Sequence, residues 1–575
     1  MVICFLAVAL ALVPQPKDVE LLGGERVSSI AEIDRAVAAF GRDDALPDEA
    51  YRFVVAATGV NVWASSSAGA FYAGVTLRQL MDDKGRIPNV RVADAPKFPW
   101  RGVMLDESRH FFGKAAVLRL LDAMSRFKLN VLHWHLTDDQ GWRIPIPGYP
   151  ALTETTRPVE NRLNFCDLSA TGTYGPYSYS KEDLLEIVRY ARARHIRIMP
   201  EVEIPGHSKV LLRACPQFAC ALTDRKVDNA VCVGKDETIR FFERAIDEVC
   251  SIFPDAVVHI GGDECNRSDW ARCPDCQARM KKENIGDVAG LQAWVTAHFD
   301  RYLRAKGRRL MGWDEIAEGG LPPGAMVMSW RGTSTGILAA KGGQDVVMTP
   351  NEYCYFDYEQ GLTDDPVRYP YNWTVMLPLA KVYSFDPLRG IPPEYHRHVL
   401  GAQGNNWSEM TRTEGELQWK VWPRAIALAE VLWSYPKDRD VPAFLKRLEP
   451  HRRKLVNEGV GAAPAVLHPA VADGGGALSR ERTGSGERFR YTHKGVESVL
   501  ALEAGKLTFD SPGRSRRTFK DNNFREIEVV FVDEGVYFAT ARRQSSEIVV
   551  TVLFDGDSVL IKDRWDERTE PHDVR

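Results

Sequence analysis

The sequence predicts an α/β protein built around a (β/α)8 TIM barrel, with an N-terminal α+β domain and a small C-terminal β-rich domain. The chain has 575 residues, which is too long for one domain. Between residues 98 and 455, short apolar runs alternate with helical patterns, which implies parallel strands joined by helices. Polar and aromatic residues follow almost every run, at the strand ends where barrel enzymes keep their active sites.

The predicted barrel strands share a run of mostly apolar residues: Gly102–Asp106, Asn130–Leu136, Ile196–Ile204, Ala256–Ile260, Arg309–Trp313, Ala325–Trp330, Asp345–Thr349 and Val399–Gln403. The predicted helices between them have apolar residues at helical spacing: Lys114–Phe127, Lys181–Arg194, Glu237–Ile252, Leu291–Lys306 and Thr333–Lys341.

The fourth predicted strand leads into the sequence AVVHIGGDE, at Ala256–Glu264. Gly261 and Gly262 remove side-chain bulk where another group approaches the backbone closely. Asp263 and Glu264 then follow at the carboxyl end of the strand. Taken alone, these two residues fit a solvated acidic turn as well as a catalytic pair.

The two flanking regions carry weaker functional signals. Residues 17–97 predict an α+β support domain, with a hairpin over Tyr51–Ala57 and Gly59–Ser65 and a helix over Ala68–Asp82. Residues 456–487 are rich in Gly, Ala, Pro and Ser and predict a linker. Residues 488–575 alternate like β-strands, and we favour a packing module over a carbohydrate-binding accessory because they contain no aromatic cluster.

The net charge and the N-terminal sequence indicate which binding partners and which cellular compartment to expect. A net charge of −4 gives no indication of a nucleic-acid or anionic-membrane surface. The apolar run Met1–Val13 fits a signal peptide over residues 1–16, and thus export to the periplasm or the medium, although the usual basic residues are missing. No other stretch is long and apolar enough to span a membrane. The sequence gives no indication of the oligomeric state.

Ten cysteines include two groups in loop-like sequence: Cys215, Cys220 and Cys232, and then Cys265, Cys273 and Cys276. In an exported protein these groups predict loop disulfides. The pair Cys273 and Cys276 alone is weak evidence for zinc, because no second pair accompanies it at the spacing of a zinc finger. We therefore expect no metal and no cofactor.

The residues at the strand ends combine carboxylates, histidines, an arginine and several tryptophans. They are Asp106, Arg109, His133, His135, Asp138, Asp139, Glu201, Glu203, His207, Asp263, Glu264, Trp313, Asp314, Glu315, Trp330, Arg331, Tyr355, Asp357, Trp407 and Glu409. Any one of them fits a structural cap or ion pair, but their joint position at one face favours an active site. Carboxylates for proton transfer and flat aromatic rings for a pyranose suit glycosyl chemistry.

The chain strongly resembles the β-N-acetylhexosaminidases of glycoside hydrolase family 20. The resemblance runs from Tyr51 to about Trp433 and includes GAFYAGVTLRQL, DAPKFPWRGVMLDESRHF, NVLHWHLTDDQGWR, MPEVEIPGHS, HIGGDE, GWDEI, YFD, GAQGNNWSE and WPRAIALAEVLW. It implies the N-terminal domain and the catalytic barrel, and β-linked N-acetylhexosamine glycosides as substrates. It says little about the C-terminal region.

The resemblance also implies a role for each matching residue. Glu264 resembles the general acid/base, and Asp263 and Tyr355 resemble the pair that orients the substrate's 2-acetamido group. Asp138 and His207 would support Glu264, with Asp139 a less certain member. The implied substrate-binding residues are Trp313, Trp330 and Trp407 around the sugar and Arg109, Asp357 and Glu409 on its hydroxyls. The loop around Tyr371, Asn372 and Trp373 matches no fixed role.

The adjacency of Asp263 and Glu264 supports the same chemistry independently. Most retaining glycosidases place two carboxyl groups roughly 5–5.5 Å apart on opposite sides of the scissile bond, which is awkward for chain neighbours. Attack by the substrate's own acetamido oxygen, through an oxazolinium intermediate, removes this difficulty. We therefore expect an exo-acting, retaining β-N-acetylhexosaminidase. The alternatives are a disaccharide-releasing enzyme of the same family and a non-catalytic sugar-binding protein, and Arg109 could serve only to pair with Asp106 or another carboxylate.

Overall fold

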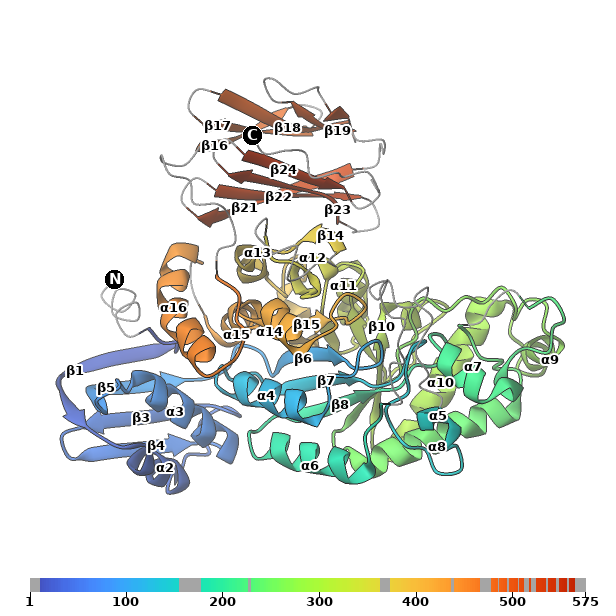
Figure 1. The fold of residues 1–575 in the computed structure, drawn as a ribbon, viewed down its shortest axis with the longest axis horizontal. Helices are drawn as coiled ribbons and strands as arrows, with labels where there is room; N and C mark the ends of the chain where they lie inside the picture. The colour runs from blue at the N-terminus through green and yellow to red at the C-terminus, as the bar shows by residue number, and fades with distance from the viewer. Residues whose placement is uncertain are drawn as a thin grey trace.

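The computed structural model describes residues 11–154, 177–225, 229–361, 373–435, 439–465 and, apart from short stretches between strands, 477–563. A barrel at the centre is flanked by an N-terminal α+β domain and by C-terminal β-sheets (Figure 1). The predicted fold class is therefore confirmed. The domain boundaries stay predictions.

All eight predicted strands are present in a closed parallel barrel, in the order β10-β11-β12-β15-β6-β7-β8-β9. The barrel strands are β6 Trp100–Asp106, β7 Val131–His135, β8 Arg197–Glu201, β9 Val257–His259, β10 Arg309–Trp313, β11 Met326–Ser329, β12 Val346–Met348 and β15 Val399–Asn406. The barrel closes where β15 pairs with β6, from Gly401 opposite Trp100 to Asn406 opposite Leu105. Parallel pairing brings all eight carboxyl ends to one face.

Five main helices of the barrel domain begin within three residues of the predicted starts: α4 Lys114–Ser125, α6 Lys181–Arg192, α8 Asp236–Ile252, α10 Val288–Ala305 and α11 Ser334–Lys341. Four further helices were not among those predicted: α13 Leu379–Ser384, α14 Glu414–Val421, α15 Arg424–Trp433 and α16 Val441–Asn457. Shorter elements lie in the connections: α5 Ala151–Glu154, α7 Lys209–Ala214, η1 Pro216–Phe218, α9 Pro274–Lys282, η2 Asp314–Ala317, α12 Asn351–Cys354, β13 Tyr358–Glu359, β14 Trp373–Met376 and η3 Pro393–His398. No helix in the described part of the chain has the length and apolar character needed to cross a membrane.

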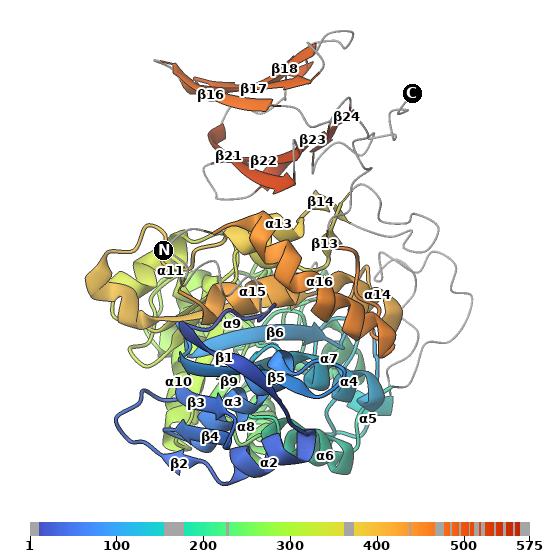
Figure 2. The same ribbon diagram turned by 90° about the vertical axis from the view of Figure 1, so that its left-hand side faces the viewer.

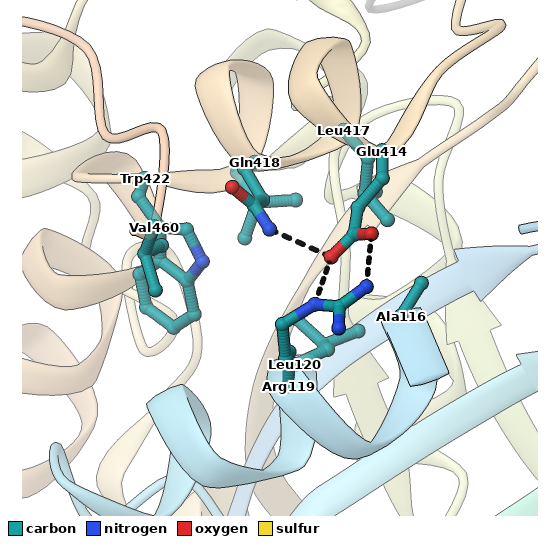
Figure 3. Close-up of a pocket in the computed structure, with 9 residues that line it drawn as sticks. Ala116, Arg119, Leu120, Glu414, Leu417, Gln418, Trp422 and Val460 are labelled. Atoms are coloured by element: carbon teal, nitrogen blue, oxygen red, sulfur yellow. Dashed lines mark hydrogen bonds and ion pairs between the residues drawn. The ribbon is translucent and has the colours of Figure 1, made fainter. Parts of the chain in front are cut away.

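Helices α4 and α14 are joined by an ion pair beside the seam of the barrel (Figure 3). The Arg119 guanidinium bonds both carboxylate oxygens of Glu414, and Gln418 Nε2 donates to Glu414 at 2.8 Å. Thr413 and Glu416 form a capping box that fixes the start of α14. The small cavity between these helices shares no residue with the predicted active site.

The N-terminal domain is a five-stranded sheet in the order β1-β5-β3-β4-β2. Its elements are β1 Asp18–Val27, α2 Ile30–Ala38, β2 Gly41–Arg42, β3 Tyr51–Ala56, β4 Gly59–Ala64, α3 Ser67–Leu80 and β5 Arg86–Asp94. Asp94 on β5 joins this domain to the barrel, because its carboxylate lies 3.0 Å from Lys128 Nζ and accepts from Trp433 Nε1 at 2.9 Å. These buried contacts agree with a supporting role.

The first described residues pack between the N-terminal domain and α16. Leu12 and Val13 are fully buried. Arg447 donates to the Leu12 carbonyl at 2.8 Å, and Gln79 accepts from the Val13 amide at 3.0 Å. The end of the predicted signal peptide is therefore part of the fold, whereas Met1–Leu10 lies outside the described residues.

The C-terminal region forms two antiparallel sheets on the side of α13 and β14, away from the N-terminal domain (Figure 2). Their strands are β16 Ala477–Thr483, β17 Gly486–His493, β18 Val496–Glu503, β19 Lys506–Asp510, β20 Arg517–Thr518, β21 Phe524–Asp533, β22 Val536–Arg543, β23 Ile548–Asp555 and β24 Ser558–Asp563. Strand β16 begins inside the stretch predicted as a linker. Its polar sequence is stabilised by pairing with β17, including the ion pair of Arg480 with Glu487.

The prediction of loop disulfides is wrong for the part of the chain that the structure describes. All eight cysteines there are free thiols: Cys215, Cys220, Cys232, Cys250, Cys265, Cys273, Cys276 and Cys354. Most of them are buried within the barrel domain.

Candidate active site

The loop after β9 positions the predicted catalytic pair. Gly261 and Gly262 adopt φ angles of +66° and +96°, which glycine reaches without strain. A Cβ on Gly261 would overlap the Glu203 carboxylate, so glycine is also required for space. Beyond this turn the Asp263 residue is buried, with 8% exposed, whereas the Glu264 side chain is 61% exposed at the mouth of the site.

His207 brings the two carboxylates together from the neighbouring loop after β8. Its Nε2 lies 3.4 Å from Asp263 Oδ2 and 3.7 Å from Glu264 Oε2. Its Nδ1 lies 3.1 Å from Asp138 Oδ1 and 3.8 Å from Asp139 Oδ2. One imidazole therefore links the residues of three successive strand ends.

Asp138 extends this network toward the first barrel strand. Its Oδ2 lies 2.7 Å from Arg109 Nη2 and accepts from His135 Nε2 at 2.9 Å. Arg109 also donates to Asp106 at 3.2 Å and to Gln140 at 3.0 Å. The network thus runs continuously from Glu264 to Arg109 across the face of the barrel.

Glu201, at the carboxyl end of β8, is the centre of a second group of charges. Its carboxylate lies 2.5 Å from His135 Nδ1, 3.0 Å from His133 Nε2 and 2.8 Å from His259 Nδ1, and it accepts from Trp313 Nε1 at 2.8 Å. Although burial opposes ionisation, these histidines hold the pKa of Glu201 well below its ordinary value. Glu201 therefore fixes Trp313 and His135 from beneath the site.

Neighbouring charges shift the pKa values of Glu264 and His207, the two residues beside Asp263. Although the Glu264 side chain is 61% exposed, the surrounding protein partly desolvates its carboxyl group, and this desolvation together with the negative charge of Asp263 raises its pKa. Burial alone would lower the pKa of His207, but Asp138 and Asp263 raise it well above its ordinary value. A protonated imidazolium therefore lies between Asp263 and Asp138, while Glu264 retains its proton to higher pH than an ordinary glutamic acid.

Four aromatic side chains form a wall next to the catalytic pair. Trp330 and Tyr355 are stacked, with ring centroids 6.1 Å apart and planes 20° apart. Trp407 lies 5.6 Å from Trp313 and 6.4 Å from Tyr355, measured between centroids. Trp330 Nε1 donates to Glu315, whose pKa is raised to about 9 by burial and by the charge of Asp263. The rings offer flat apolar faces to a ligand. Their contacts with one another and with Glu315 fix the orientation of the rings.

Three polar side chains converge where β15 meets β6. Arg109 Nη2 lies 3.6 Å from Glu409 Oε1, and the Arg109 guanidinium lies 5.0 Å from the Trp407 ring. Asp357 is buried, and burial together with the charge of Glu409 raises its pKa to about 7. Within the described residues, Asp357 Oδ1, Glu409 Oε2 and Asp263 Oδ1 are buried oxygens without a hydrogen-bond partner. Unpaired buried acceptors are costly, so these atoms are available for a bound ligand.

Comparison with known families identifies the barrel. Residues 98–436 match the catalytic domain of glycosyl hydrolase family 20, and residues 17–95 match domain 2 of the same family. The chain belongs to glycoside hydrolase family 20. The resemblance found in the sequence is therefore confirmed, and the protein is a glycoside hydrolase by family.

The proteins to which this family-20 chain is similar are named as β-hexosaminidases or as a β-N-acetylglucosaminidase. It is 39% identical over 430 residues to a β-hexosaminidase of Porphyromonas gingivalis, covering 71% of this chain and 54% of that protein. It is 33% identical to a β-hexosaminidase of Akkermansia muciniphila, covering 72% and 84%. A structure of the exo β-N-acetylglucosaminidase of Vibrio harveyi with N-acetylglucosamine is similar with a TM-score of 0.71 and 27% identity, covering 79% and 78%. The chain thus spans about half the length of the Porphyromonas gingivalis relative.

The family-20 barrel brings together all eleven predicted site residues. Asp139 also lies in the network, through His207 and through Lys209 at 3.3 Å. Tyr371 and Asn372 lie outside the described residues, and Trp373 begins β14. Arg109 pairs with three carboxylates, Asp106, Asp138 and Glu409, rather than only with Asp106, and its Nε donates to Gln140.

Four residues of the site were among the predicted strand-end residues but were given no role: His135, Glu201, Glu203 and Glu315. Their positions in the sequence, inside or directly after apolar strands, could have indicated a role, because buried charged residues are rare unless they are paired. His133 and His135 alternate on β7, and Glu201 and Glu203 alternate at the end of β8, which places each pair on one side of its strand.

Proposed function

We propose that this family-20 chain is an exo-acting β-N-acetylhexosaminidase. It removes terminal, non-reducing N-acetylglucosamine or N-acetylgalactosamine from β-glycosides, with retention of configuration. The observation that carries the proposal is the position of Asp263. Its buried, unpartnered Oδ1 adjoins Glu264 in the chain, and both carboxylates converge on His207 beside a wall of aromatic rings.

Glu264 acts as the general acid and then as the general base. Its exposed carboxyl group can reach a glycosidic oxygen at the mouth of the site. The raised pKa favours the protonated form that a proton donor requires. After the leaving group departs, the ionised Glu264 can deprotonate the incoming water.

Asp263 and Tyr355 act on the 2-acetamido group. Asp263 Oδ1 is the acceptor for the acetamido N–H, and it stabilises the positive charge that develops on nitrogen as the oxazolinium ring closes. Tyr355 has its pKa raised well above its ordinary value by burial, so its hydroxyl stays a donor for the acetamido oxygen. Trp313, Trp330 and Trp407 enclose the group and exclude competing water.

Arg109, Asp357 and Glu409 end the pocket at the non-reducing side. The guanidinium of Arg109, 3.6 Å from Glu409, and the unpartnered oxygens of Asp357 and Glu409 complement the hydroxyl groups of one terminal sugar. A further sugar at that position would replace these hydrogen bonds and leave buried charges unpaired. This arrangement favours release of single sugars over release of disaccharides.

A pair of chromogenic substrates tests the proposal. The p-nitrophenyl β-glycoside of N-acetylglucosamine should be hydrolysed efficiently, whereas the matching glucoside, which lacks only the acetamido group, should hardly react. Hydrolysis of neither would favour a non-catalytic sugar-binding protein. Equal hydrolysis of both would contradict participation of the acetamido group.

Export of the enzyme is also part of the proposal. It is supported by the apolar run Met1–Val13, followed by Pro14 and Pro16. Because Leu12 and Val13 are buried against the folded enzyme, cleavage would come before Leu12. Mass spectrometry of the N-terminal peptide from the periplasm and the medium tests this, and recovery of the intact N-terminus in the cytoplasm alone would contradict it.

A further inference from the structure

We propose that Cys220, Cys232, Cys273 and Cys276 bind one structural zinc ion. All four side chains are buried, and their sulfur atoms all lie within 4.8 Å of one another. Cys232 Sγ lies 3.6 Å from Cys273 Sγ and 3.6 Å from Cys276 Sγ. None of the four cysteines belongs to the catalytic network, and the proposal does not rest on the proposed function.

The sulfur separations fit a tetrahedral metal site. Four thiolates at the usual Zn–S distance of about 2.3 Å place neighbouring sulfur atoms about 3.8 Å apart. A disulfide requires about 2.05 Å. The separations of 3.6 Å are close to the first value and far from the second. Four buried thiols without a metal or a disulfide would also leave a polar cluster with no strong interactions.

The backbone around the cluster is shaped to bring the four sulfurs together. Cys220 follows η1, Cys232 precedes α8, Cys273 is the N-cap of α9, and Cys276 lies in the first turn of α9. A Cβ on Gly234 would overlap the backbone of Asp275 and Cys276. Glycine at position 234 therefore lets the first pair of cysteines approach the second. Cys220 and Cys232 thus supply in space the second cysteine pair that does not accompany Cys273 and Cys276 at the spacing of a zinc finger.

Cationic side chains surround the loops of the cluster. A zinc ion with four thiolates carries a net charge of −2, which needs nearby positive groups when it is buried. Lys235 Nζ donates to the carbonyls of Gln217 and Ala219 at 2.7 Å and 2.9 Å, next to Cys220. The buried Arg279 donates to the Gly234 carbonyl at 3.2 Å and also pairs with the exposed carboxylate of Asp236. Lys235 and Arg279 thus place positive charge beside the loops of an anionic metal cluster.

The cluster connects the two loops that carry the catalytic residues. The Val231 amide, adjacent to Cys232, donates to Pro205 at 3.1 Å, two residues before His207. Trp270, three residues before Cys273, donates from Nε1 to the Val231 carbonyl at 2.9 Å. Asn229 donates to the Glu264 carbonyl at 3.5 Å. A zinc ion at this point would hold the loop after β8 to the loop after β9, and so maintain the spacing of His207 and Glu264.

Metal analysis of the full-length protein, purified without chelators, tests the site. We expect one zinc per chain, with four sulfur ligands at about 2.3 Å by X-ray absorption. C273S/C276S should lose the zinc. C250S changes a half-buried cysteine on α8 outside the cluster, and it should keep the zinc. Purified wild type with no metal, with iron in place of zinc, or with oxygen or nitrogen ligands would overturn the proposal.

A second measurement uses wild type alone, in case the double variant does not fold. A mercurial thiol reagent should release one zinc per chain to a colorimetric chelator, while the midpoint of thermal unfolding falls by roughly 5–10 °C. Peptide mapping of the untreated protein under denaturing, non-reducing conditions, with a thiol-alkylating reagent, should find all four cysteines alkylated and none in a disulfide. Disulfides among the four, or thiol modification without zinc release, would overturn the proposal whatever the enzymatic activity.

Discussion

His207 Nε2 lies 3.4 Å from Asp263 Oδ2, and through this contact a cation is placed between the two predicted catalytic carboxylates and Asp138. The positive charge of His207 lowers the pKa of Glu264, whereas burial and Asp263 raise it. The balance of these effects sets the pH range over which Glu264 can donate a proton.

His207→Asn should shift the pH profile of kcat/KM. Loss of the imidazolium removes an effect that lowers the pKa of Glu264, so that pKa should rise. Because activity requires protonated Glu264, the falling limb at high pH should move to higher pH. The maximum of kcat/KM should drop by roughly 10–100-fold, because Asp263 and Asp138 lose their shared partner. His298→Asn, which removes a half-buried histidine paired with Glu243, is the control. A limb that stays in place would show that His207 does not control Glu264.

Glu264→Gln should affect substrates according to their leaving groups. A glutamine cannot donate the proton, so hydrolysis of a poorly activated alkyl or sugar glycoside should fall by roughly 10²–10⁴-fold. A dinitrophenyl glycoside needs little protonation and should be cleaved much closer to the wild-type rate in the first step. Steady-state and burst kinetics on both substrates measure the difference, and equal losses on both would remove Glu264 from this role.

Asp263→Asn and Tyr355→Phe should weaken binding of a thiazoline analogue of N-acetylglucosamine, which mimics the cyclised intermediate. For Asp263→Asn we expect a loss in kcat of roughly 10²–10³-fold, because the charge on the oxazolinium nitrogen is no longer compensated. Isothermal titration with the thiazoline and with free N-acetylglucosamine separates intermediate stabilisation from ground-state binding. Equal losses for both ligands would contradict the assigned roles.

Asp357→Asn should increase stability at neutral pH and reduce activity. The pKa of Asp357 is about 7 in the folded protein, above the ordinary value of about 3.9. Between these values the folded state binds more protons than the unfolded state, so this group lowers stability as the pH rises from 4 to 7. The variant should match wild type near pH 4 and exceed it by about 4 kcal/mol at pH 8, because a difference of one pKa unit corresponds to about 1.4 kcal/mol. Denaturant unfolding at both pH values measures this, and a variant less stable than wild type at pH 8 would contradict it.

The barrel could be predicted from the sequence because each of its strands is a distinct apolar run. Val257–His259 is only three residues long in the structure, yet the run AVVHI and the following glycines were sufficient to place it. The start of the C-terminal sheets was harder to predict. Strand β16 is polar on both sides of its pleat, and its stability comes from pairing with β17, which the strand's own sequence does not show.

The catalytic residues could be predicted because they follow strands directly in the sequence. The Glu201 network and the cysteine cluster depend instead on contacts between distant segments. Cys232 and Cys273 are 41 residues apart, and the close approach of the loop before α8 to the start of α9 brings their sulfur atoms together. The sequence showed two separate groups of cysteines, and it could not show that four of them share one centre.

Proton NMR of the first product released from chitotetraose tests the central claim most directly, because it reports both the size and the anomeric configuration of the product. The account predicts free N-acetylglucosamine, released from the non-reducing end and appearing first as the β-anomer, with the α-anomer formed later by mutarotation. An initial α-anomer would contradict the retaining, substrate-assisted mechanism. A disaccharide as the first product would contradict the closed pocket formed by Arg109, Asp357 and Glu409.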